Sequence, residues 1–106
     1  MLYRQGDVLL RRAKSIPKDL KPVPLDAGRV ILAYGEVTGH AHVVEGNVEL
    51  LAADLDEMSQ RFLRVLSEAK VIHDEHATIT LPPGDYPVIR QREYSSADME
   101  PMRVAD

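Results

Sequence analysis

Glycine and proline divide this chain into short apolar segments, and that feature limits its fold more than any other. The 106 residues include 6 Gly and 7 Pro. The apolar segments between them are rich in Val, Ile and Leu, which favour strands, and they include residues 8–10, 30–34, 41–44 and 48–52. The pattern predicts a mainly β fold, namely a small single-domain barrel or sandwich of short, mostly antiparallel strands with at most one short helix.

Turn-forming residues predict how the first strands are connected. Residues 15–28 contain Pro17, Pro22, Pro24 and Gly28, and we expect them to form a loop over the surface. The Gly-Asn pair at 46–47 predicts a tight turn between two short strands.

The C-terminal part carries a second turn signal. Residues 77–94 alternate between polar and apolar side chains on both sides of a Pro-Pro-Gly-Asp sequence at 82–85, which predicts a hairpin. Residues 95–106 are polar, and we expect them to form a loosely docked tail of the same single domain.

Residues 54–69 allow two interpretations. Asp54 and Glu57 fit a capping box, and the apolar side chains that follow fall at helical spacing, which indicates one amphipathic helix. The competing interpretation is a turn, a strand at 61–66 and a further turn at Ser67-Glu68. The helical positions are Leu55, Met58, Phe62, Leu66 and Ala69.

The composition excludes several classes of site. The chain has no cysteine, which rules out disulfides, cysteine-based zinc fingers, iron–sulfur clusters and thiol nucleophiles. No segment reaches the roughly 20 apolar residues that a membrane span needs, so no membrane partner is expected. The first residues lack the features of a secretory signal, and a cytoplasmic location is therefore the default expectation.

The net charge of −4 gives no overall attraction to nucleic acid. Acidic residues are concentrated at 45–57 and basic residues at 1–24. A solvated surface of uneven charge is the simplest interpretation, and a basic rim for a phosphate or an acidic partner is the alternative. The basic residues are Arg4, Arg11, Arg12, Lys14, Lys18 and Lys21.

The four histidines form two pairs, and this is the strongest functional signal in the sequence. His40 and His42 are two residues apart, so in a strand their side chains lie on the same face. His73 and His76 are three apart, which suits a strand that ends in a turn. If the two strands are neighbours, three or four imidazoles share one site. Imidazole binds Zn, Fe, Mn, Ni and Cu, so the pattern predicts a divalent-metal site with zinc as the first candidate.

Acidic side chains near the histidines could complete such a site. Glu45 is the first candidate for a further ligand, and Glu36 or Glu75 could bind the metal or orient an imidazole. Three ligands and an open position would suit a metal-dependent enzyme, whereas a saturated site would suit a zinc that only stabilises a small core. A chance cluster of exposed histidines is the simplest alternative.

A metal-independent interpretation is also open. Two imidazoles across a cleft can act as general base and general acid on a phosphodiester, as in a small phosphodiesterase or RNase. The His-Ala-Thr sequence at 76–78 has a form used by some two-histidine phosphoesterases. On this interpretation the candidate catalytic residues are His40, His76 and Glu75.

Two arginines near the C-terminus could bind an anion. Arg90, Arg92 and Tyr94 fall on one face of the predicted last strand. A surface ladder of cross-strand pairs is the simpler interpretation. The functional one is that Arg90 and Arg92 bind a small-molecule or phosphate-containing ligand near the histidines. The sequence leaves a homo-oligomer open.

Two resemblances add to these predictions. Residues 35–46, GEVTGHAHVVEG, resemble the first metal motif of the cupins, and LPPG at 81–84 is similar to part of the second. The cupin resemblance implies that His40, His42 and Glu45 are metal ligands. Most of the chain resembles a family of small uncharacterised bacterial and phage-borne proteins, which implies a strand rather than a helix at 61–66. The motifs shared with that family are QGDV, GEVTGHAH, HDEH, LPPGDY and QREY.

Overall fold

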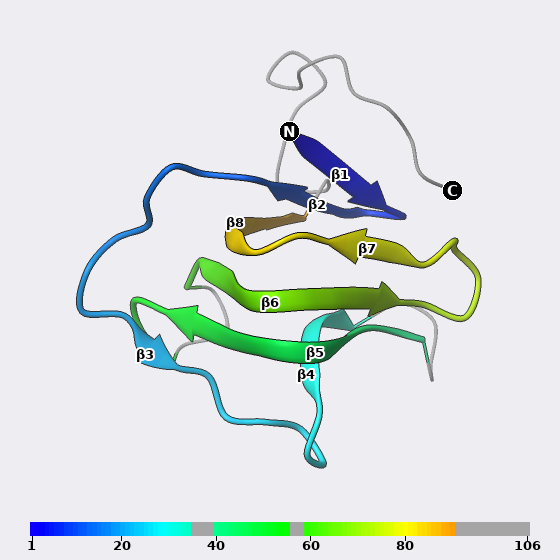
Figure 1. Ribbon diagram of the computed structural model, residues 1–106. Helices are drawn as coiled ribbons and strands as arrows, with labels where there is room; N and C mark the ends of the chain where they lie inside the picture. Colours follow the sequence, from blue (N-terminus) through cyan, green and yellow to red (C-terminus); the bar gives the residue numbers. More distant parts are fainter. Residues whose placement is uncertain (35–39, 56–58, 91–106) are drawn as a thin grey trace.

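The computed structural model describes residues 1–34, 40–55 and 59–90, and all its regular elements are strands (Figure 1). The prediction of a mainly β fold is therefore confirmed. None of the described residues lies in a helix that could cross a membrane. The strands are β1 (Leu2–Gln5), β2 (Val8–Arg11), β3 (Lys21–Pro22), β4 (Val30–Tyr34), β5 (Ala41–Ala52), β6 (Arg61–Ile72), β7 (Ile79–Leu81) and β8 (Gly84–Arg90).

The strands form one antiparallel sheet in the order β1-β2-β8-β6-β5-β3, with β4 also paired to β5 and β7 also paired to β6. The two long strands each change partner along their length. The first half of β6 pairs with β8 and the second half with β7, while β5 pairs first with β4 and then with β3. Among the described strands the sheet does not close into a barrel. It curls around a single core instead.

Side chains from both halves of the long strands meet in this core. Leu63 and Val65 come from the first half of β6, and Ala69 and Val71 from the second. Tyr86 is fully buried, and its ring packs edge-on against Tyr3 with centroids 6.1 Å apart. The described part of the chain also buries two polar side chains, Gln5 and His42, which are 1% and 2% exposed.

The structure decides between the two interpretations of residues 54–69. Arg61–Ile72 form strand β6, so the helix is wrong. The predicted turn at Ser67-Glu68 is also wrong, because β6 continues through both residues. Exposed polar residues such as these are typical of turns, but both lie where the pairing of β6 changes from one partner strand to the next.

The predicted turn at 46–47 is wrong as well, because β5 runs without interruption from Ala41 to Ala52. The pairing of β5 with β6 shifts register between Gly46 and Val48, which makes this site a β-bulge. Gly46 has φ +127°, and a Cβ atom here would overlap the backbone carbonyl of Glu68. Glycine therefore lets the two long strands approach each other at the bend.

The predicted hairpin at 77–94 is wrong in its pairing. Strands β7 and β8 do not pair with each other; both pair with β6. Successive prolines hold the backbone extended, so the chain crosses to the next part of β6 instead of reversing. The alternation itself is confirmed, since Ile79 and Leu81 are buried and Thr80 is exposed. Residues 91–94 and the predicted tail at 95–106 lie outside the described residues.

Candidate metal centre

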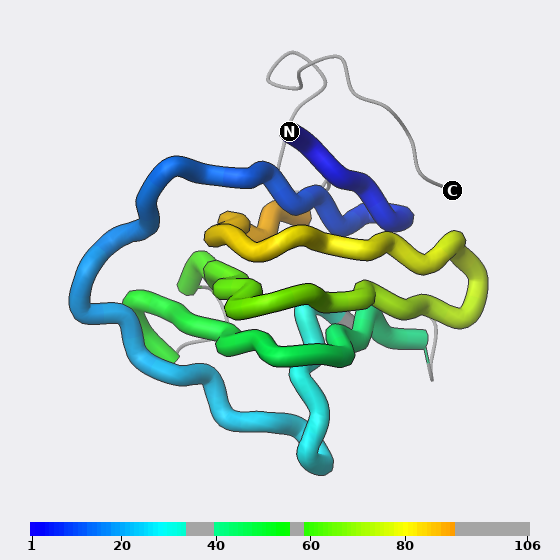
Figure 2. The backbone as a smooth tube through the Cα atoms, viewed as in Figure 1, coloured from blue at the N-terminus to red at the C-terminus, as the bar shows by residue number. Residues whose placement is uncertain are grey.

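Three segments that are distant in sequence meet at one end of the molecule (Figure 2). They are the start of β5, the turn that follows β6, and the turn between β1 and β2. His40 immediately precedes β5 and His42 lies within it, whereas His73 and His76 follow β6. The ring centroids of His42 and His73 are 4.4 Å apart, those of His73 and His76 4.7 Å, and those of His40 and His73 5.8 Å. The structure thus brings all four imidazoles together, and we call them the histidine cluster.

A buried glutamine fixes the orientation of His42. The side-chain amide nitrogen of Gln5 donates hydrogen bonds to the carbonyls of Val71 and Ala77, both at 2.9 Å. Its oxygen must therefore be the atom that faces Nδ1 of His42, at 2.8 Å. An amide oxygen only accepts, so Nδ1 carries the proton and donates it. In the neutral ring this leaves a lone pair on Nε2.

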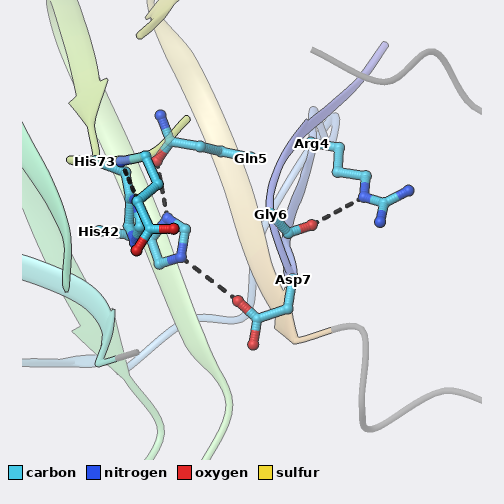
Figure 3. A network of polar contacts seen from close by, with 7 residues as sticks. Arg4, Gln5, Gly6, Asp7, His42 and His73 are labelled. Carbon is cyan, nitrogen blue, oxygen red and sulfur yellow. Dashed lines mark hydrogen bonds and ion pairs between the residues drawn. The ribbon is translucent and has the colours of Figure 1, made fainter. Parts of the chain in front are cut away.

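That lone pair faces a carboxylate. Nε2 of His42 is 3.4 Å from Oδ1 of Asp7, which enters the site from the β1–β2 turn (Figure 3). Burial, together with repulsion from His73, lowers the pKa of His42 from 6.5 to about 4, although the carboxylate of Asp7 opposes the shift. The ring is therefore neutral near pH 7. Two hydrogen-bond acceptors then face each other, which is unfavourable unless a cation or a water molecule lies between them.

The outer part of the cluster is acidic. His40 lies between two carboxylates, with Nδ1 3.4 Å from Asp74 and Nε2 3.2 Å from Glu75. A neutral imidazole has one N–H, so it can donate to only one of them. Within the described residues Nδ1 of His40 is buried without a hydrogen-bond partner. The two carboxylates therefore make the outer part of the site acidic, which favours a bound cation.

The spacing of the rings fits a shared ion. A tetrahedral metal bound to imidazole nitrogens at about 2.1 Å holds neighbouring ring centroids roughly 5 Å apart. His42, His73 and His76 have centroids separated by 4.4, 4.7 and 6.2 Å.

The donor atoms are not yet arranged for binding. Across residues 1–34, 40–55 and 59–90, no three His, Asp or Glu side chains form a ready metal-binding group. One reason is that Nδ1 of His73 accepts a hydrogen bond from the backbone N–H of Glu75 at 3.0 Å. A metal at Nδ1 of His73 requires this hydrogen bond to break, and a metal at Nε2 requires the ring proton to move to Nδ1, which breaks the same bond.

The other predicted site residues are distributed differently. Glu45 is exposed on β5, opposite Lys70 and on the other face from His42, so the structure does not bring it to the cluster. Arg90 ends β8 opposite Val8, the residue after Asp7. Glu36 and Arg92 lie outside the described residues.

Sequence reasoning missed Gln5 and Asp7. Residues 2–5 were not predicted as a strand, yet β1 and β2 form a hairpin whose turn is Gly6-Asp7. The available signal was the Gly-Asp pair between two partly apolar runs, which is typical of a hairpin.

The fold and the cluster define a small all-β domain with a histidine-rich site at one end of its sheet. A family model described as Domain of unknown function (DUF8820) matches residues 4–91, and the chain belongs to this family. The match includes the four histidines and the Gln5-Gly6-Asp7 turn. No curated protein and no solved structure matches the chain.

Metal-free protein should lose stability as the pH falls from about 6.5 towards 4. Between these values the unfolded chain takes up a proton that folded His42 excludes, since burial lowers the pKa of this ring to about 4. The expected loss is up to about 3 kcal/mol, and His42 causes none above pH 6.5. Urea unfolding across this range measures the loss. An NMR titration of the His42 ring checks its cause, and a midpoint at 6.5 or above would contradict it.

Proposed function

We propose that the histidine cluster binds a divalent transition metal, with zinc as the first candidate and Fe, Mn or Ni as alternatives. The ligands would be Nε2 of His42, the carboxylate of Asp7, and the imidazoles of His73 and His76. The observation that carries this proposal is the lone pair of His42, which faces Asp7 at 3.4 Å with its other nitrogen already bonded to Gln5. A metal-binding histidine ordinarily has its second ring nitrogen held in this way.

Asp7 takes the place that the cupin resemblance assigned to Glu45. A carboxylate with three imidazoles is a chemically suitable donor set for zinc, iron or manganese. Bound there, the ion would act as a Lewis acid or would activate water for attack on a small or phosphate-containing substrate. His40, with Asp74 and Glu75, would lie beside it as a proton-transfer group. A purely stabilising zinc is the non-catalytic alternative.

Replacing Asp7 with asparagine tests the ligand assignment. The variant keeps the size of the side chain and removes its charge, so zinc affinity should fall by about 10- to 100-fold. Titration calorimetry on untagged protein measures it. Glu45→Gln is the matched control, because it removes a carboxylate from the opposite face of β5, and its affinity should match the wild type. Equal affinities for all three proteins would contradict the role of Asp7.

One observation favours acid–base catalysis without a metal as a second candidate. Hydrogen bonds place the proton of His42 on Nδ1, whereas Nδ1 of His73 is an acceptor and its proton lies on Nε2. The two adjacent rings thus differ as base and acid. Hydrolysis of a chromogenic phosphodiester by chelator-treated protein would support this candidate, and recovery of activity only with added metal would support the first.

A further inference from the structure

We propose that the Gln5-Gly6-Asp7 turn positions the metal-binding imidazoles, with Gln5 orienting His42 and Gly6 making room for His76. This inference rests on the proposed metal site and extends it to two residues that bind no metal themselves. Gln5 is the last residue of β1 and Gly6 follows it in the turn, so one short segment contacts both His42 and His76.

Gln5 is held too firmly to be a passive core residue. Its side chain is 1% exposed and makes three hydrogen bonds, to the carbonyls of Val71 and Ala77 and to Nδ1 of His42. The two carbonyls fix which end of the amide faces His42. The tautomer of the neutral His42 ring, with its proton on Nδ1, is therefore set by a residue 37 positions away in sequence.

The chemistry explains why an amide suits this position better than a carboxylate. A carboxylate at position 5 would favour the doubly protonated ring, since a negative charge beside an imidazole raises its pKa. A proton on Nε2 would then compete with the metal. The neutral amide holds Nδ1–H without attracting that second proton. It also donates to the two carbonyls, which a carboxylate cannot do.

Gly6 provides space that a larger residue would fill. A Cβ atom on Gly6 would lie 2.6 Å from Nε2 of His76, closer than side-chain contacts allow. The backbone of Gly6 also has φ +57°. Arg4 supports the turn, because its Nε donates a hydrogen bond to the carbonyl of Gly6 at 2.8 Å (Figure 3). A side chain at this position would require the ring of His76 to shift from its present place beside the turn.

The first test compares Gln5→Met with the wild type. Nitrogen-15 NMR of metal-free protein should place the His42 proton on Nδ1 in the wild type. In the variant, the neutral ring should be a mixture of the Nδ1–H and Nε2–H tautomers. Zinc affinity should fall about 10-fold or more. Val44→Ala removes a buried side chain from the same face of β5 and controls for lost stability, because its zinc affinity should not change. An unaltered proton position and an affinity within twofold of wild type in Gln5→Met would overturn the proposal.

The second test uses two glycines of similar backbone conformation. Gly6 and Gly28 have φ +57° and +78°, but a Cβ on Gly28 meets nothing within 4 Å. Gly6→Ala and Gly28→Ala should both lower the thermal midpoint, whereas only Gly6→Ala should weaken zinc binding. Equal affinities would overturn the role of Gly6. If Gly6→Ala does not fold, Gln5→Met decides the proposal. If the wild type binds no zinc, the proposed function fails, yet the NMR result still decides whether Gln5 orients His42.

Discussion

Replacing His42 with alanine should abolish zinc binding, with an expected loss of affinity of at least about 100-fold. The structure gives both ring nitrogens of His42 a partner, with Nδ1 bonded to Gln5 and Nε2 facing Asp7. Its removal would take away a proposed ligand and leave the amide oxygen of Gln5 buried without its donor. Competition with a fluorescent zinc chelator measures the affinity over the required range.

The same experiment separates lost binding from lost packing. Val44→Ala, on the same strand and face, should destabilise the protein but keep its zinc affinity. The double variant His42→Ala/His76→Ala should bind zinc about as weakly as His42→Ala alone, because ligands of one ion act as a unit. Wild-type affinity in His42→Ala, or an equal loss in Val44→Ala, would contradict the assignment.

Replacing Gly46 with alanine should cost about 3 kcal/mol or more in the free energy of unfolding. The backbone there has φ +127°, which alanine adopts with strain, and the added Cβ would overlap the Glu68 carbonyl of the neighbouring strand. Both contacting groups belong to the paired backbones of β5 and β6, so neither moves without disturbing the bend that brings the two halves of the sheet together.

Gly28→Ala gives the matched comparison for this loss of stability. Its φ of +78° lies close to the left-handed region that alanine can adopt at a moderate penalty, and no atom lies within 4 Å of the new methyl group. We expect about 1–2 kcal/mol for Gly28→Ala. Urea unfolding measures both variants. A loss at Gly46 no larger than at Gly28 would show that the close approach of the strands has no energetic consequence.

The strands were predictable where an apolar run in the sequence ends at a turn or loop of the structure. Val8–Arg11 and Val30–Tyr34 follow directly from such runs. The long strands were not predictable, because Gly46-Asn47 and Ser67-Glu68 carry turn residues within continuous strands. Local chemistry there is the same for a turn and a bulge, and the pairing of distant segments decides between them.

The site divides in the same way. The histidine cluster could be predicted from the spacing of the two pairs, because strand geometry places His40 and His42 on one face. The Gly6-Asp7 pair signals a turn, but it does not show that Gln5 and Asp7 belong to the site, since their place there depends on β1 and β2 folding against the ends of β5 and β6. The same alternation places Glu45, three residues after His42, on the opposite face of the strand. Glu45 was predicted as a ligand only because it is close to the histidines in sequence.

Anomalous diffraction at the zinc edge, from crystals of untagged protein grown with zinc, would show directly whether a metal binds between His42 and Asp7. We expect a peak between Nε2 of His42 and the carboxylate of Asp7, with His73 and His76 turned towards it. Crystals that show zinc elsewhere on the surface, with no peak between His42 and Asp7, would contradict it.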